Sequence, residues 1–442
     1  MISPRSWVWM MCLMSQAGAT PLSDQRSIHH AWFASSGDRI VTCAAETRFR
    51  FWDSTTGEPV PTEIDQFAGG RDSWSHVDLA GKWILTGSKQ TGSRLYDFQT
   101  GKALSPMISA FFSREEANAV LSPGGFRLIA FERPDVAGIY DTKTGRKLTE
   151  IPLSLSSDDG DSLPEGVFEE NGKRAWILDT GGVIRCLDTT TWKALGETIW
   201  HPGEGYFKGL EISADGRYVL AYSDVADCGG KGVACVWDAL TRRPAGKPVE
   251  RSWGAAAEFV EGGKRVRFSF GRGASYVAQL PSLNPDYYLP VDDEIGSPGV
   301  LSADGGSTFV SWGRDETIVF TDAATGASRG NYHTHQPIVA VVASPVKDRA
   351  VALLGQTPKL GEKPSSFTLE RVDRREGAVP GEPLSCSASA TLMNEDGSLD
   401  SWVPMQMSPD GTRVMLLANG RVRIFQVADL KELASTAPVS TP

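Results

Sequence analysis

Residues 48–60 read RFRFWDSTTGEPV, in which apolar residues alternate up to Trp52-Asp53 and a Thr-Gly pair follows. This alternation predicts a β-strand, because successive strand side chains point to opposite sides. Asp53 can close a turn by accepting a hydrogen bond from a backbone N–H two residues further on, and Gly57 supplies the left-handed conformation that starts the return strand. The stretch therefore predicts two strands joined by a tight turn.

Similar motifs return eight more times. The clearer copies are RLYDFQTG at 94–101, GIYDTKTG at 138–145, IRCLDTTTW at 184–192, CVWDALT at 235–241 and IVFTDAATG at 318–326, and the weaker ones start at Tyr276, Leu369 and Val422. The motif residues are Trp52, Asp53, Gly57, Asp97, Gly101, Asp141, Gly145, Asp188, Trp237, Asp238, Asp322 and Gly326. A period of roughly 42 to 54 residues is typical of four-stranded blade repeats.

A second signal precedes each copy, namely a short turn between two apolar stretches, as in ISADGRYVLA at 212–221. Eight of these nine turns contain Gly, and the exception has Val346-Lys347. Phe49 and Phe51 point to one side of their strand and Trp52 to the other, which indicates a sheet covered on both faces. We therefore predict an all-β fold: a single β-propeller of four-stranded antiparallel blades, with nine units counted and seven or eight blades as alternatives.

The repeats resemble the WD40-repeat family of β-propellers, particularly bacterial members. The resemblance covers the chain from about residue 20 and is carried by the Gly turn, the Trp-Asp strand end and the Thr-Gly turn. The Gly-His pair that usually opens a repeat of this family is missing, and only WHPG at 200–203 is similar to it. We expect packing of Trp, Phe and Val to hold the blades together in place of the hydrogen-bond network that the family builds on that His.

The first residues have the layout of an export signal. Arg5 precedes a mostly apolar stretch from Trp7 to Met14, and Ala17-Gly18-Ala19 follows as a small-residue cleavage site. We predict a signal peptide at 1–19, the propeller at 20–436 and a short tail at 437–442, with the mature protein periplasmic or extracellular. If the N-terminus is instead the lead-in to the first repeat, the protein is cytoplasmic.

The composition of the chain argues against several classes of partner and site. A net charge of −10 without a basic run opposes nucleic-acid binding. Apart from the start of the chain, no segment approaches the roughly 18 apolar residues of a membrane span. Of the six cysteines, only Cys228 and Cys235 are close in sequence; we favour two unbridged thiols there over a disulfide, and their spacing matches no zinc site.

Both kinds of short turn should share one end of the propeller, so that the long, variable connections share the other. Rigid scaffolds that display variable loops commonly bind partners through them. The binding-face candidates in these connections are Trp74, Phe111, Phe112, Asp158, Asp159, Trp200, Tyr206, Phe207 and Trp402. An aromatic and acidic surface suits a protein, peptide or glycan; alternatively, the aromatics pack back on the blades and the acids confer solubility.

No residue pattern indicates catalysis, a metal or a cofactor. The pairs Asp158/Asp159 and Asp292/Asp293 are adjacent in sequence, an arrangement that rarely presents both acids to one substrate. His333 and His335 would share one face of a strand, but no third ligand is near, so we interpret them as surface residues. We predict a noncatalytic scaffold for a protein or peptide. The alternative is an exported glycan or lactone enzyme, with acids from several innermost strands converging in the central channel.

Overall fold

A computed structural model describes residues 28–44, 48–64, 73–78, 82–88, 91–110, 112, 118–155, 164–202, 206–224, 231–252, 255–270, 275–289, 300–302, 308–312, 316–334, 336–346, 349–355, 368–373, 384–386, 405–418 and 421–435. The chain divides into two compact units. The described part of unit 1 falls within 69–97 and 103–289, and that of unit 2 within 19–68, 98–102 and 290–442.

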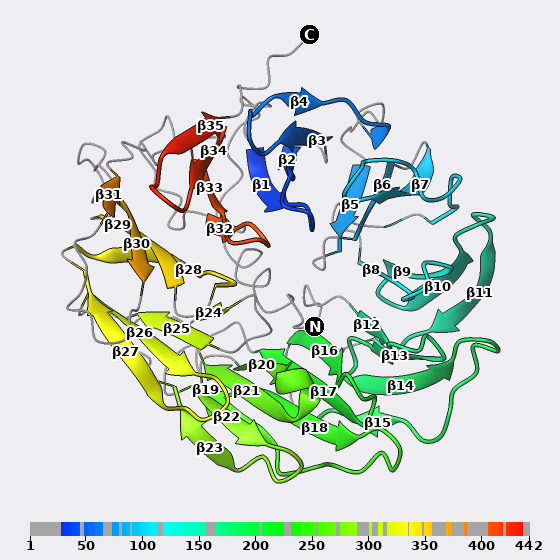
Figure 1. Cartoon of the computed structure of the whole chain (residues 1–442). Coiled ribbons are helices and arrows are strands. Elements are labelled where there is room, and N and C mark those ends of the chain that lie inside the picture. The colour runs from blue at the N-terminus through cyan, green and yellow to red at the C-terminus, as the bar shows by residue number, and fades with distance from the viewer. Residues whose placement is uncertain are drawn as a thin grey trace, which may run out of the picture. The chain divides into compact units, whose positions relative to one another are not determined.

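Unit 1 contains five antiparallel sheets in the described residues (Figure 1). Their strands are β5 (Ser73–Val77), β6 (Trp83–Ser88) and β7 (Gly92–Asp97); β8 (Ala119–Leu121), β9 (Arg127–Arg133), β10 (Val136–Asp141) and β11 (Lys147–Pro152); β12 (Glu165–Phe168), β13 (Arg174–Leu178), β14 (Val183–Asp188) and β15 (Ile199–Trp200); β16 (Tyr206–Ile212), β17 (Tyr218–Asp224), β18 (Lys231–Asp238) and β19 (Val249–Ser252); β20 (Ala255–Val260), β21 (Arg265–Phe270), β22 (Tyr276–Gln279) and β23 (Pro285–Tyr288). A 3₁₀ turn, η4 (Glu261–Gly263), joins β20 to β21. The sheet of β5 to β7 has three strands, and isolated bridges from Ala103 and Ile108 occupy part of its outer edge.

Unit 2 contains four four-stranded antiparallel sheets in the described residues. Their strands are β1 (Ile28–Phe33), β2 (Arg39–Ala44), β3 (Arg48–Asp53) and β4 (Pro59–Val60); β24 (Val300–Leu301), β25 (Thr308–Trp312), β26 (Thr317–Asp322) and β27 (Ser328–His333); β28 (Ile338–Ala343), β29 (Arg349–Leu354), β30 (Thr368–Asp373) and β31 (Leu384–Cys386); β32 (Met405–Met407), β33 (Arg413–Ala418), β34 (Arg421–Gln426) and β35 (Glu432–Ser435). The fold class is that of a β-propeller, and the nine sheets in the described residues match the nine repeats counted in the sequence.

The turn predicted from Asp53 forms as expected. Its Oδ1 accepts hydrogen bonds from the backbone N–H groups of Thr55 and Thr56, both at 2.8 Å, and from the Thr56 hydroxyl. The N–H groups of Thr56 and Thr55 hold the pKa of the Asp53 carboxyl below its usual range. Gly57 has φ +72°, the left-handed conformation predicted for it. The same carboxylate-centred turn recurs at Asp141, Asp188, Asp238 and Asp322.

The two short turns of a repeat lie together, as predicted. In the first repeat, Ser54 N donates to Asp38 O, and the Ser54 hydroxyl donates to Gly37 O at 2.7 Å. The hydroxyls of Thr142 and Thr189 make the equivalent bonds to the carbonyls of the preceding Gly turns. Because both short turns occupy one end of a sheet, the long connections leave from its other end.

Glycine is not required at every left-handed turn position. Trp192, Arg242, Leu283 and Leu430 have φ between +55° and +63° in the turns that join the third and fourth strands of their sheets. Three of these side chains are buried, those of Trp192, Leu283 and Leu430. For example, the Trp192 ring lies edge-on to Phe168, with centroids 6.4 Å apart. The strain of a left-handed residue is thus offset by packing.

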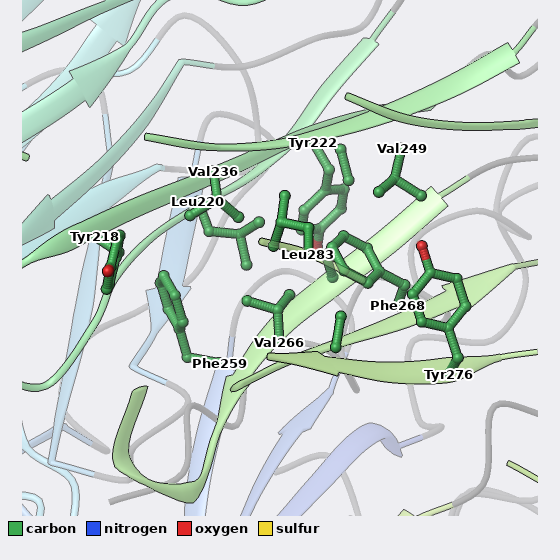
Figure 2. Close-up of a cluster of buried hydrophobic side chains, with 13 residues drawn as sticks. Tyr218, Leu220, Tyr222, Val236, Val249, Phe259, Val266, Phe268, Tyr276 and Leu283 are labelled. Carbon is green, nitrogen blue, oxygen red and sulfur yellow. The ribbon is translucent and has the colours of Figure 1, made fainter. Parts of the chain in front are cut away.

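The hydrophobic cores lie between neighbouring sheets. Figure 2 shows one of them, in which Tyr222 and Val249 of the β16–β19 sheet meet Phe268 and Tyr276 of the next sheet. Further clusters join neighbouring sheets in unit 1, and others do so in unit 2. Burying a large apolar side chain contributes about 1.5–3 kcal/mol, so this stacking supplies much of the stability of such small sheets. It also explains why the strands are apolar on both sides.

In unit 2, the first and last sheets of the chain adjoin. Phe33 N donates to Gln406 Oε1 at 2.8 Å, and Arg413 Nη1 donates to Gly37 O and to the Ser54 hydroxyl, both also at 2.8 Å. The outer strand of the last sheet is β35, supplied by the C-terminal segment itself. In the described residues, the two sheets therefore meet through hydrogen bonds that involve a side chain, and neither sheet takes a strand from the other end of the chain.

Candidate functional site

Two exposed aromatic residues stand where outermost strands of unit 1 end and long connections begin. Trp200 is the last residue of β15, pairs with Val183 of β14 and is 67% exposed. Tyr288 is the last residue of β23, pairs with Tyr276 of β22 and is 60% exposed. Large aromatic side chains are normally well buried, so exposure of this degree at the predicted binding end is informative.

Glu250 occupies the position of Trp200 in the following sheet. Glu250 pairs with Val233 of β18, as Trp200 pairs with Val183 of β14. Val233 and Val183 each stand five residues before the aspartate that ends their strand. Glu250 is also exposed.

A buried histidine holds the backbone next to Trp200 in place. His201 N donates to Gly182 O at 2.9 Å, and the imidazole Nε2 lies 3.2 Å from Ala221 O of β17. Its ring also packs edge-on against Trp237 of β18, with centroids 5.7 Å apart. Burial lowers the pKa of His201 to about 4, so the ring is neutral at neutral pH. His201 thereby links two sheets and fixes the residue that precedes it.

The expectation that packing alone holds the blades is therefore wrong at this boundary, where the His of WHPG does bond the neighbouring sheet. At the preceding boundary, between the β8–β11 and β12–β15 sheets, an apolar residue takes the place of this histidine. Leu153 follows β11 as His201 follows β15, donates its N–H to Asp135 O and is buried. In unit 2, the indole N–H of Trp52 donates to the Thr42 hydroxyl at 2.8 Å, so the first repeat keeps a polar contact of its own.

Two sequence-predicted binding residues belong to the core. Trp74 is 1% exposed on β5, its indole N–H donates to the Ser93 hydroxyl at 2.9 Å, and its ring lies edge-on to Phe112 at 5.7 Å. Phe112 is 4% exposed in the same cluster. Neither offers contact area to a partner, which corrects their assignment to the binding face.

The other predicted binding residues divide into three cases. Trp200 lies exposed at the expected end. Tyr206 and Phe207 begin strand β16, although the sequence placed them in a loop. Phe111, Asp158, Asp159 and Trp402 lie outside the described residues.

Three of the buried glutamates stand on the first strands of their sheets and were not singled out from the sequence. Glu165, Glu211 and Glu258 lie on β12, β16 and β20, the first strands of successive sheets. Glu211 Oε2 accepts a hydrogen bond from Phe259 N at 3.1 Å, and Glu258 forms an ion pair with Arg267 on the paired strand β21. At least two of these carboxylates therefore serve as contacts between strands. Their only sequence signal is a carboxylate within an otherwise apolar first strand.

A hollow of about 400 Å³ lies at the short-turn end of unit 1, between 169–174 and 214–216. The Glu169 carboxylate in its wall accepts hydrogen bonds from Arg174 Nε and from the indole N–H of Trp176. This buried acid is therefore satisfied by its own sheet. Among the described residues, no group of three or more His, Cys, Asp or Glu side chains is placed to hold a metal ion.

Two further pairs of candidate residues are each described for one member only. Cys235 is a buried free thiol whose pKa burial raises to about 12, while Cys228 lies outside the described residues. His333 is exposed on the outermost strand β27, and His335 is outside the described residues. None of the helices in the described part of the chain has the length and apolar character to cross a bilayer.

No protein-family model matches the sequence, and no curated protein matches it. Solved structures do match the fold. A eukaryotic initiation factor shares 12% identity with a TM-score of 0.54, over 95% of this chain and 100% of that one. The β-propeller domain of Cps50 (Swd1) from Myceliophteria thermophila shares 14% identity (TM-score 0.39, 70% of this chain and 96% of that one). BamB from Moraxella catarrhalis also shares 14% (TM-score 0.44, 76% and 96%). At such identities the matches concern the fold alone.

Proposed function

We propose that this protein is a noncatalytic, WD40-like propeller similar to bacterial members of that family, which binds a protein or peptide at the end where the long connections leave its sheets. The observation that carries the proposal is the exposure of Trp200. Its ring is available to a partner, while the neighbouring His201 is buried between two sheets. An exposed aromatic on a fixed backbone loses little conformational entropy on binding, which is the character of interface hot spots.

The rival explanation is that exposed residues at this end only solubilise the protein. Carboxylates and short polar residues serve solubility, whereas an exposed indole opposes it. Tyr288, on another outermost strand of the same unit, adds a second large aromatic surface. The exposure of both Trp200 and Tyr288 favours a binding role for this end over a role in solubility alone.

Affinity capture with matched variants tests the proposal. The immobilised protein, its Trp200→Ala variant and its Leu240→Ala variant are each exposed to extract of the source cells. Leu240 is 84% exposed but lies in a short turn, at the opposite end of its sheet, so it serves as the control. We expect a protein that wild type and Leu240→Ala retain and Trp200→Ala loses. After purification, it should bind Trp200→Ala about 30-fold more weakly, corresponding to a hot spot of about 2 kcal/mol. Equal binding by all three would overturn the proposal.

An exported enzyme with acids on its innermost strands is the second candidate, and Glu165, Glu211 and Glu258 are the residues that favour it. It is the weaker one because Glu211 and Glu258 already bond to neighbouring strands. Export remains part of the proposal for either function, on the strength of the apolar stretch and small residues in 1–19.

A further inference from the structure

We infer that a second surface of unit 1, the basic turn patch, binds a short acidic segment of a protein that presents carboxylates and apolar side chains together. The patch consists of Met107, Phe126, Lys143 and Arg146. Phe126, Lys143 and Arg146 lie in the two short turns of the β8–β11 sheet (Figure 1), at the opposite end from the long connections of that sheet. The inference therefore goes beyond the proposed function and does not depend on it.

One turn, 141–146, supplies both cations of the patch and contacts both apolar residues. Lys143 Nζ lies 4.4 Å from the centre of the Phe126 ring. A Cβ placed on Gly145 would lie 2.2 Å from Met107 O, so the segment that carries Met107 runs directly against the turn. The first and last residues of the turn are joined by a backbone hydrogen bond of 3.0 Å. Because the turn is this short, an extended segment of a few residues, at about 3.3 Å per residue, spans the patch.

The apolar members of the patch offer contact area to a partner. Phe126 is 51% exposed and Met107 is 41% exposed. Large apolar side chains are normally well buried, so two of them exposed beside one turn are informative. The ammonium group of Lys143 has three donors, and its contact with the Phe126 ring leaves them able to reach a carboxylate.

The two cations of the patch are in excess over the acids around them. Between residues 118 and 155, every carboxylate has a cationic partner in the same sheet. These ion pairs are Glu132–Lys147, Glu150–Lys147, Asp135–Arg133 and Asp141–Arg127. Lys143 and Arg146 are exposed, and neither forms an ion pair in the described part of the chain. Their charges are therefore available to a partner.

This local excess of positive charge favours an acidic partner. Residues 103–152 contain as many Lys and Arg as Asp and Glu residues, so the net charge of −10 comes from the rest of the chain. Exposed charges are screened beyond about 8–10 Å at physiological salt, so a short acidic segment on the patch interacts mainly with Lys143 and Arg146. An anionic bilayer extends far beyond the patch and would also meet the acids elsewhere in the chain, so it fits less well.

The direct test is fluorescence anisotropy with defined probes. The first is a labelled eight-residue peptide in which pairs of Glu alternate with pairs of Leu. Because strand side chains alternate in direction, each face of this peptide carries both residue types when it is extended. The second peptide has Lys in place of Glu, and the third has Ser in place of Leu. Vesicles of phosphatidylglycerol, measured by co-sedimentation, are the fourth probe.

The variants change the charge or the aromatic surface of the patch, with one matched control. They are Lys143→Glu, Arg146→Glu, Phe126→Ala and the control Lys193→Glu. Lys193 is exposed, and its backbone oxygen closes the equivalent turn of the next sheet with a hydrogen bond of 3.0 Å, as that of Arg146 does. That turn has Thr190 at the position of Lys143, so it lacks the second cation. Thermal melts confirm that these exposed substitutions leave the fold intact.

We expect the Glu-Leu peptide to bind wild type and Lys193→Glu equally, and to bind Lys143→Glu and Arg146→Glu at least about 10-fold more weakly. Phe126→Ala, or Ser in place of Leu in the peptide, should weaken binding about 5-fold, and added salt should weaken it further.

Three results would overturn the inference. The first is equal binding of the Lys-Leu peptide. The second is a loss in Lys193→Glu as large as that in Arg146→Glu, since the effect would then reflect net charge alone. The third is no binding of the Glu-Leu peptide to wild type; vesicle binding that depends on Lys143 would in that case replace the acidic segment by an anionic membrane.

Discussion

The guanidinium group of Arg242 lies 4.3 Å from the centre of the Trp176 ring, and this contact joins two neighbouring sheets. Trp176 is fully buried on β13, whereas Arg242 sits in the turn after β18 with φ +63°. The same guanidinium donates to Leu195 O at 3.1 Å. The contact across the boundary offsets a left-handed conformation that costs roughly 1–2 kcal/mol in an L-residue.

Substitution of Arg242 separates these two effects. Arg242→Ala loses the contacts and keeps the strain, so we expect the free energy of unfolding to fall by about 1–2 kcal/mol. Arg242→Gly loses the same contacts but relieves the strain, and should be about 1 kcal/mol more stable than the Ala variant. Urea unfolding followed by tryptophan fluorescence measures both. Equal stability of the Ala and Gly variants would show that the turn is unstrained.

Two turn glycines should respond differently to Ala. A Cβ on Gly145 would meet the backbone oxygen of Met107 at 2.2 Å, whereas a Cβ on Gly125 would meet nothing within 4 Å. Both have φ near +70°. We expect Gly125→Ala to cost about 1 kcal/mol through strain alone, and Gly145→Ala to cost at least about 3 kcal/mol because backbone must move. Similar unfolding midpoints for the two variants would contradict the close approach of 107 to 145.

His201 should make stability depend on pH. Burial depresses its pKa from 6.5 to about 4, so the folded state favours the neutral ring. The resulting stability is complete above pH 6.5 and is lost as pH falls through 4, by up to about 3 kcal/mol in this window. His201→Leu, which copies Leu153 in the preceding sheet, should remove this part of the dependence. Parallel curves of unfolding free energy against pH for the variant and wild type would show that His201 does not titrate in this way.

The N-terminus of the mature protein tests export. We expect the protein recovered from the periplasm or medium of its source to begin near residue 20, because a signal peptidase would cut after Ala17-Gly18-Ala19. Edman sequencing or intact mass gives the answer. A mature chain that still carries Met1 would reject the signal peptide.

Local chemistry made much of the fold predictable. The turn at Asp53 depends on a carboxylate and a backbone within four residues of each other, so its hydrogen bonds could be inferred from the sequence. Repetition of that turn gave nine repeats, and the structure has nine sheets in its described residues. Phe51 and Trp52 point to opposite faces of their strand and both are buried, so their apolar character correctly indicated a sheet covered on both faces.

Features that depend on a neighbouring sheet were not predictable. Trp74 follows a long connection, as an exposed loop residue would, and its burial depends on Ser93 and Phe112. The contacts of His201 were not predicted either, because Ala221 and Trp237 lie across a sheet boundary. In both cases the sequence gives the residue type but not what packs against it.

Site-specific photo-crosslinking tests binding at the long-connection end most directly. The photoreactive residue benzoylphenylalanine is placed at position 200 or, at the other end of a sheet, at position 240, and the protein is irradiated in its source cells. Our account predicts a covalent adduct with a partner protein from position 200 and none from position 240. Adducts only from position 240, or from neither position, would contradict it.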